Sequence, residues 1–469
     1  MAKSIKILFL ISIPVFLWGL LLILPTFDDW TYLTTPYFGD FFDNKGLLPY
    51  KSYWRPFDAT IGYILGLNYK MFPALNHILI LLGHVGSTIL VYLLTKKNIL
   101  AATFFYLSTA MLGTVLDIDS ANQVYSQFWG LMALWFYQKE KKWLWIVCFL
   151  IATFVKENGI MFAFIPIFIQ WGHEKNFAIT RKYIKDGMMA LGAIVCYGIA
   201  RIILTPHDNV QNAEYMDNSI LDHVKDLIQY STTWIPMDMA AVAYSPTRCL
   251  PLAILTLLLA IPFLYAICTK MIQNRKDKMM YVLIISFFLA GAPHLLTLVS
   301  VMHSYAGLGM ISLLIGYLFP AETLKKKEII MFSAFITATL ISDIHHWHEA
   351  YKSGLLGKDL AVKVLEKTNG TPQTVRIISI DNNEPKYSIF NVIPRDAFGW
   401  GKAAKYESGY TVANEEVTDT LIGPFETPSA KEIGIKEMTQ EILSANKYEA
   451  IWIIDSTDVK VISIIPEIQ

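Results

Sequence analysis

Apolar runs of membrane-spanning length follow one another along most of this chain. They lie at 7–24, 75–95, 99–116, 122–138, 143–155, 159–172, 187–204, 249–269, 279–299, 305–320 and 329–343. About 20 consecutive apolar residues suffice to cross the hydrocarbon core of a bilayer. Only 17% of the 469 residues are charged and the mean hydropathy is +0.41, which excludes a disordered or nucleic-acid-binding chain. We expect an α-helical polytopic membrane protein.

Basic clusters in short loops predict how the chain crosses the membrane, because cytoplasmic loops carry an excess of Lys and Arg. The clusters are Lys96-Lys97; Lys139, Lys141 and Lys142; Lys175, Arg181, Lys182 and Lys185; Lys270, Arg275, Lys276 and Lys278; and Lys325 to Lys327. With the N-terminus in the cytoplasm, eleven crossings place every cluster inside. The loops at 28–75, 117–123, 156–159, 205–247 and 300–304 are then outside. The expected location is the cell inner (plasma) membrane.

The chain divides into two expected domains. Residues 1–343 form the transmembrane domain, with large outer loops at 26–74 and 205–248; helical spacing at 221–228 predicts an interfacial helix or a mobile lid. Residues 344–469 change character and, after an odd number of crossings, lie outside. Helical patterns at 359–367 and 433–445 alternate there with strand-like runs at 375–380, 450–455 and 459–465. Such alternation predicts a small α/β domain.

The two crossings between Lys142 and His173 are unusually short. About 15 residues per crossing reach roughly 22 Å, less than the ~30 Å hydrocarbon core. The turn Lys156-Glu157-Asn158-Gly159 is therefore expected to be recessed below the outer surface. Charged backbone turns at that depth are tolerated only where protein or a water-filled cavity surrounds them. The alternative is a single long kinked helix that carries a buried Lys-Glu pair.

Three sets of polar residues could carry chemistry on the outer side. Asp28-Asp29 follow the first apolar run, and a loop rich in aromatic residues then leads to Trp54-Arg55-Pro56. Adjacent carboxylates are often just a solvated flank, but a carboxylate can also take a proton from an acceptor hydroxyl. Arg55 and Lys156 can bind a phosphate and stabilise its charge, with Glu157 orienting Lys156. We expect the three sets to meet in one cavity, where the leaving group is a polyprenyl phosphate.

These motifs, in this order, resemble the GT-C superfamily of polytopic glycosyltransferases. Asp28-Asp29, Tyr53-Trp54-Arg55-Pro56 and Lys156-Glu157-Asn158-Gly159 are most similar to the motifs of protein O-mannosyltransferase-like enzymes, especially those with tetratricopeptide repeats. The aminoarabinose transferase of lipid A shares the broader plan. The resemblance covers about residues 1–320. It implies a first-loop Asp as general base, inversion at the anomeric carbon, and a dolichyl- or undecaprenyl-phosphate-linked sugar donor.

The chain also departs from that pattern. The His/Glu motif of the subgroup is replaced by Leu116-Asp117-Ile118-Asp119, which leaves Asp119 or Asp117 as the second carboxylate. The late Glu-Arg-Tyr motif is replaced by Met302-His303-Ser304-Tyr305, so His303 and Tyr305 are the candidates for phosphate contact there. The repeats are absent. The acceptor, whether protein, lipid or glycan, therefore cannot be carried over.

Other functions remain open at this point. A lipid-linked sugar transporter or flippase would need broken or charged spans and paired repeats, which the sequence does not display. A glycan polymerase would use the same lipid donors, and a non-catalytic scaffold would not need the Lys156 turn. His345 with His348, or His345 with Glu349, could share one helix face as zinc ligands, but no third ligand is near in sequence. We therefore assign no metal site, although a divalent metal cofactor stays possible.

Overall fold

The computed structural model describes residues 19, 22–34, 55–71, 74–174, 180–204, 219–236, 250–295, 300–368, 374–382, 388–407, 413–445 and 447–463. The chain forms two compact units. The helical unit comprises Met1–Leu21, Pro36–Met239 and Leu250–Ile344. The C-terminal unit comprises His345–Gln469 together with Leu22–Thr35 and Ala240–Cys249.

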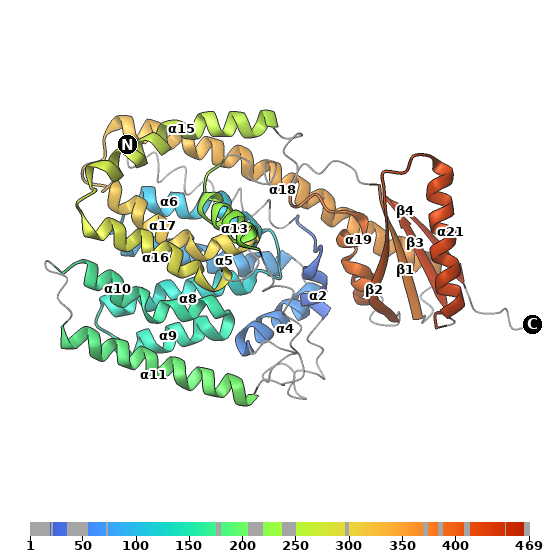
Figure 1. Ribbon diagram of the computed structural model, residues 1–469, viewed down its shortest axis with the longest axis horizontal. Coiled ribbons are helices and arrows are strands. Elements are labelled where there is room, and N and C mark those ends of the chain that lie inside the picture. Colours follow the sequence, from blue (N-terminus) through green and yellow to red (C-terminus); the bar gives the residue numbers. More distant parts are fainter. Residues whose placement is uncertain are drawn as a thin grey trace, which may run out of the picture. The chain divides into compact units, whose positions relative to one another are not determined.

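The helical unit is built from helices of very different lengths (Figure 1). They are α4 (Pro56–Met71), α5 (Ala74–Leu94), α6 (Ile99–Leu107), α7 (Leu112–Val115), α8 (Ala121–Gln138), α9 (Lys142–Val155), α10 (Ile165–Gly172), α11 (Arg181–Leu204), α13 (Ile220–Thr232), α15 (Leu250–Gln273), α16 (Lys278–Leu295), α17 (Tyr305–Leu318) and the first part of α18 (Lys326–Thr368), with 3-10 turns η1 (Thr109–Met111), η2 (Glu157–Ala163) and η3 (Val301–Ser304). Helix α13 confirms the helical spacing predicted at 221–228.

Within the described ranges, six helical segments are long and apolar enough to cross a membrane. They are Leu75–Leu94, Arg181–Ile203, Leu250–Gln273, Lys278–Leu295, Val301–Leu318 and Lys326–Lys367. Large hydrophobic side chains on α11 and α15 are exposed, such as Ile203 (73%) and Tyr265 (66%), as expected for contact with lipid. The chain therefore has the character of a multi-pass membrane protein.

The predicted number of eleven crossings is not confirmed. The first predicted run, 7–24, lies almost entirely outside the described residues. The run at 99–116 folds as three short pieces, α6, η1 and α7, and the run at 159–172 folds as η2 followed by α10. Nearly every side chain of α6, η1 and α7 is buried. A helix that is apolar on all sides and surrounded by protein belongs to the core of the bundle, so its hydropathy alone does not reveal a crossing.

Loops that carry the predicted basic clusters contact one another at one end of the helical unit. The contacts are Lys142–Asp186, Lys182–Glu140 (3.3 Å), Lys270–Glu328 (2.9 Å) and the hydroxyl of Tyr317 with Asp277. Each lysine in this set forms an ion pair with a carboxylate from another loop. These loops therefore share one end of the unit, as the charge pattern predicted.

Helix α9 runs alongside α11 in the same direction, and the chain reverses after it. Lys142 at the start of α9 pairs with Asp186, and Glu157 after its end lies 3.8 Å from Arg201. Both intervals are fifteen residues long, so the two helices keep register. Segment η2–α10 then returns, and Tyr183 near the start of α11 donates to Glu174 at 2.7 Å. The alternative of one long kinked helix is therefore wrong.

The reversal depends on a glycine. The chain turns so sharply after α9 that a Cβ at Gly159 would lie 2.2 Å from the carbonyl carbon of Ala152 in that helix. Because the obstacle is backbone, no side-chain rotation can relieve it. Gly159 thus lets η2 lie directly against the last turn of α9.

We predict that Gly159→Ala destabilises the helical unit by about 1–3 kcal/mol, because the added methyl meets backbone. Gly192→Ala is the matched control, since a Cβ at Gly192 of α11 meets nothing within 4 Å. The control should be as stable as the wild type or slightly more so, because alanine favours a helix. Thermal unfolding of the purified proteins in detergent measures both. Equal losses in the two variants would contradict the proposed packing.

The C-terminal unit contains a four-stranded sheet with the order β2-β1-β3-β4. The strands are β1 (Thr374–Asp381), β2 (Ala413–Ile422), β3 (Ala450–Asp455) and β4 (Asp458–Ser463). Strands β2, β1 and β3 are parallel, and β4 is antiparallel to β3. The three predicted strands are confirmed, but β2 was missed. Its sequence, ANEEVTDTLI, is polar because it lies at the sheet edge, where Asp419 accepts two hydrogen bonds from Arg376 (2.7 and 2.9 Å).

Helices cover both faces of this sheet. On one face Ile378, Ile380, Ile451 and Ile453 pack with Ile442 of α21 (Pro428–Ala445), which contains the predicted helix 433–445. On the other face Trp452 is buried, and its ring centroid lies 6.4 Å from that of Phe398. Phe398 joins α19 (Pro394–Ala397), η4 (Gly399–Gly401) and α20 (Lys402–Glu407).

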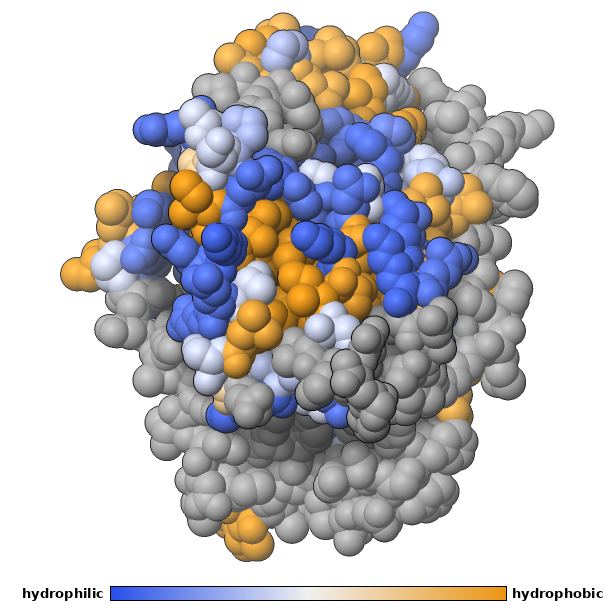
Figure 2. Space-filling view, turned by 90° about the vertical axis from the view of Figure 1, so that its right-hand side faces the viewer, coloured by the Kyte–Doolittle hydropathy of each residue, from blue (hydrophilic) through white to orange (hydrophobic). Residues whose placement is uncertain are grey.

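The two crossover connections lie on opposite faces because β1→β2 and β2→β3 run in opposite directions along the sheet. The part of α18 after Ile344 also belongs to this unit and contains the predicted helix 359–367. Figure 2 shows a group of hydrophobic side chains near the middle of this face with hydrophilic side chains on either side of it.

Candidate functional site

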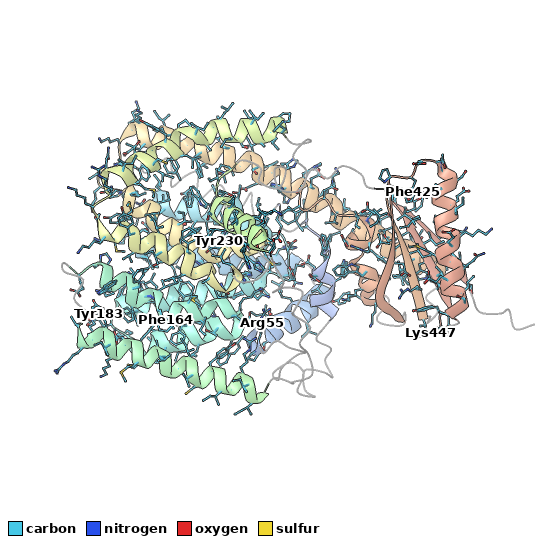
Figure 3. The ribbon with its side chains drawn as sticks, in the orientation of Figure 1. Arg55, Phe164, Tyr183, Tyr230, Phe425 and Lys447 are labelled. Atoms are coloured by element: carbon cyan, nitrogen blue, oxygen red, sulfur yellow. The ribbon has the colours of Figure 1, made fainter. Side chains whose placement is uncertain are left out.

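Loops predicted to lie outside meet at the end of the helical unit opposite to the basic loops. Figure 3 shows Arg55 at this end and Tyr183 at the other. The contacts that join the loops are Arg55–Glu157, Asp58–Asn122, Ser120–Met302 and Ser304–Thr233. Residues from five separate segments are thereby gathered into one region. We call Arg55, Asp58, Asp119, Asn122, Lys156 and Glu157 the Arg55 cluster.

Arg55 and Glu157 form the central ion pair of the cluster. The guanidinium donates from Nε to Oε1 at 2.8 Å and from Nη2 to Oε2 at 2.6 Å. This two-pronged geometry is the strongest form of an Arg–carboxylate contact. Asp58 and Arg201 flank the pair, at 3.9 Å from Arg55 and 3.8 Å from Glu157. The hydrogen bonds of Glu157 thus orient Arg55, whereas the sequence suggested that Glu157 orients Lys156.

Lys156 is a buried ammonium with few hydrogen-bond partners. It is 7% exposed, and its one hydrogen bond to a described residue is a long contact of 3.4 Å with Asn122 Oδ1. The amide of Asn122 in turn donates to Asp58 at 3.2 Å. Burial, reinforced by the charge of Arg55, lowers the pKa of Lys156 to about 8, although Glu157 and Asp58 oppose this shift. An ammonium has three donors, so Lys156 retains capacity for an anion.

Asp119 and His303 lie beside the same cluster. Asp119 acts electrostatically on Lys156, and its Oδ1 accepts from the Ser120 hydroxyl at 3.1 Å. The His303 ring is stacked on His294, with centroids 4.0 Å apart and planes 11° apart. The charges of Lys156 and Arg55 reach His294. Of the predicted site residues, Arg55, Asp119, Lys156, Glu157 and His303 therefore share one region of the helical unit.

The other predicted site residues lie elsewhere. Tyr305 is fully buried, and its hydroxyl contacts Nδ1 of His84 at 2.9 Å within the bundle. Asp28 and Asp29 are in α2 (Asp28–Thr34), which belongs to the C-terminal unit. Tyr53 and Trp54 lie outside the described residues. The expected meeting of Asp28 with Arg55 and Lys156 joins residues of different units, and it stays a prediction.

Sequence reasoning missed several polar residues near the site. Asp58 is three residues after Arg55, a spacing that brings side chains together on a helix, and Arg201 is a charge inside a predicted span. Both signals were present in the sequence.

A metal site is not evident in the described part of the chain. No group of three or more His, Cys, Asp or Glu side chains there could hold a metal ion. Glu349, one of the ligands considered from the sequence, instead accepts hydrogen bonds from Asn391 (2.8 Å) and Lys352 (3.2 Å). The arrangement of the Arg55 cluster suits an anion rather than a cation, because its under-coordinated group is an ammonium.

Comparison of the chain with protein-family models, curated proteins and solved structures found no match. The resemblance to GT-C glycosyltransferases accordingly depends on the motifs alone. The functional argument below starts from the chemistry of the Arg55 cluster.

The Glu157 carboxylate should make the stability of the protein pH-dependent. Burial by itself would raise the pKa of Glu157. The charges of Arg55 and Lys156 outweigh burial and lower this pKa to about 2, against an ordinary value of 4.5. The pair therefore contributes its full stability above about pH 4.5 and loses it progressively as the pH falls towards 2. The pKa difference corresponds to about 2–4 kcal/mol.

We predict that Glu157→Gln lowers the apparent Tm above pH 4.5 and removes this part of the acid dependence. Glu140→Gln is the control, because Glu140 forms an exposed pair with Lys182, and exposed pairs contribute little. Thermal unfolding in detergent between pH 2 and 7 compares the three proteins. Parallel pH curves for wild type and Glu157→Gln would contradict the assigned pairing.

Proposed function

We propose that the protein is a membrane glycosyltransferase that moves a hexose or pentose from a polyprenyl-phosphate donor to an acceptor hydroxyl on the outer side of the membrane. The observation that carries the proposal is Lys156, a buried ammonium whose one hydrogen bond to the described residues is long, in a bundle of apolar helices. Although carboxylates lie near it, such a group has donors left over for an anionic ligand that can enter the membrane. A lipid-linked phosphate is such a ligand.

The Arg55 cluster supplies what a departing phosphate needs. Lys156 can donate directly to phosphate oxygens, while Arg55 is fixed by Glu157 and adds a second positive charge. In the proposed step the acceptor oxygen attacks the anomeric carbon, and the bond from that carbon to the phosphate oxygen breaks. The polyprenyl phosphate leaves with the bonding electrons, and its charge is balanced by the two cations.

A carboxylate has to take the proton of the acceptor hydroxyl. The resemblance to GT-C enzymes assigns this role to Asp28 or Asp29, with inversion at the anomeric carbon. Asp119, beside Lys156, is the proposed second carboxylate, and His303 is a proposed contact to the donor. Tyr305 is the least favoured of the predicted contacts, because its hydroxyl is engaged with His84.

One observation favours a second candidate function, a transporter or flippase of lipid-linked sugars. Helical segments are interrupted inside the bundle, at α6–η1–α7 and at α9–η2–α10. Interrupted helices are typical of transporter binding sites. The two functions differ in chemistry, because only the transferase breaks the bond between sugar and phosphate.

The test is incubation of the protein in proteoliposomes with polyprenyl-phosphate sugars labelled in the sugar. A transferase releases polyprenyl phosphate and labels an acceptor, a polymerase gives products of several units, and a flippase moves intact donor between leaflets.

We predict that Asp28→Asn abolishes transfer while the protein stays folded and inserted. Full activity in both Asp28→Asn and Asp29→Asn would refute the assigned base.

Binding of the donor should weaken as the pH rises through about 8. Lys156 carries a proton below its pKa of about 8 and becomes neutral above it, so its attraction for phosphate is lost at high pH. Farnesyl phosphate, a short lipid phosphate, is a suitable probe for calorimetric titration at pH 6.5 to 9.5. Lys156→Gln should bind at least about tenfold more weakly at pH 6.5 and lose the pH step. Lys225→Gln, which removes an exposed ion pair on α13, is the control. It should keep the wild-type affinity at pH 6.5 and the loss of binding at higher pH.

A further inference from the structure

The segment that carries Asp28 and Asp29 is built into the C-terminal unit, although more than 300 residues separate them in sequence. The Phe27 amide donates to the carbonyl of Asp396 at 2.8 Å. Two glycines of α18 allow close packing here. A Cβ at Gly354 would lie 2.6 Å from the carbonyl oxygen of Leu24, and one at Gly357 would lie 2.1 Å from that of Ala397. The segment therefore lies directly against backbone of this unit.

Trp30 of α2 provides the largest buried contact. It is 1% exposed, and its ring centroid lies 6.0 Å from that of Tyr406 in α20. Beneath it, Gly399 has a φ of +56°, and a Cβ there would lie 2.7 Å from the Cβ of Trp30. Both the backbone conformation and the space require glycine at this position. The fit of Trp30 over Gly399 thus fixes α2 to the chain between β1 and β2.

The two carboxylates of α2 have different surroundings. Asp29 is 2% exposed, and its Oδ2 accepts from the Thr26 amide at 3.2 Å, while its own amide donates to the Thr26 carbonyl at 2.9 Å. Asp28 is exposed. A carboxylate that fixes its own turn is suited to positioning, whereas an exposed neighbour can meet a substrate.

We propose that the C-terminal unit positions the general base, Asp28. It does so by holding α2 through the packing of Trp30 on Gly399 and through the Thr26–Asp29 turn. This inference rests on the proposed glycosyltransferase function. It gives the C-terminal unit a role in the reaction itself, in place of the repeats found in the enzymes that the chain resembles. Asp29, Trp30 and Gly399 are positioning residues in this proposal.

The experiment compares full-length wild type with Gly399→Ala in detergent by amide hydrogen exchange and by sugar transfer. A methyl at Gly399 should loosen α2, so exchange across 22–34 should accelerate about tenfold or more, while exchange in α4 stays unchanged. The kcat of transfer should fall about tenfold or more, with the donor KM within about twofold of wild type, because the donor is bound by other residues.

Two further comparisons separate positioning from general loss of structure. Gly434→Ala introduces the same methyl on α21, where the three nearest atoms belong to the Leu421 side chain and the nearest lies at 2.9 Å; it should change neither exchange at 22–34 nor transfer. Trp30→Phe should recover part of the kcat that Trp30→Ala loses. Asp29→Asn should retain reduced transfer with its pH profile intact, whereas Asp28→Asn should show none.

The possible results lead to distinct conclusions. If amide exchange at 22–34 is unchanged in both Gly399→Ala and Trp30→Ala, these contacts do not hold α2 and the proposal is wrong. Faster exchange with an unchanged kcat overturns the positioning role. If the wild type transfers no sugar from any labelled donor, the proposed function fails together with the catalytic part of this inference. The exchange data then still decide whether the C-terminal unit holds α2.

Discussion

The arrangement of the helical unit depends on how its buried charged side chains are paired. Every ionised group inside such a bundle must be compensated by neighbours, because desolvation of an isolated charge is very unfavourable. Arg55 and Glu157 satisfy this requirement with paired hydrogen bonds, and they connect the start of α4 to the turn after α9. The equal intervals from Lys142 to Glu157 and from Asp186 to Arg201 bring Arg201 to the same place. Within the Arg55 cluster, Lys156 makes a single long hydrogen bond to the described residues, so its remaining donors can bind a ligand.

Much of the helical unit could be predicted from its charge pattern. The basic loops and the remaining loops separate to opposite ends, and the short interval from Lys142 to His173 correctly indicated a reversal at Lys156. The motifs also predicted that Arg55 lies near the turn at Lys156, and Arg55 contacts Glu157 in that turn. These predictions succeeded because they depend on short stretches of sequence. The charges of a loop indicate at which end of the bundle it lies, and the number of residues in a helix sets how far the helix extends.

Other features depend on contacts that the sequence does not mark. Short buried pieces such as α6 have the same hydropathy as a spanning helix, so crossings could not be counted reliably. Strand β2 is polar because it lies at an edge and pairs through Asp419. The pairing partner of Glu157 was misjudged, since adjacency to Lys156 in sequence says nothing about which cation its side chain faces. The attachment of α2 to the C-terminal unit depends on Gly399, whose φ of +56° cannot be read from residue type.

That attachment has a consequence for biosynthesis. Trp30 leaves the ribosome long before Gly399, about 370 residues ahead of it. At 5–20 residues per second the interval is roughly 20 to 75 s. During this time Trp30 lacks its contacts with Gly399 and Tyr406, and its burial must await synthesis of the segment that contains them. The packing of α2 against the C-terminal unit can therefore form only late in synthesis, when two segments far apart in sequence come together.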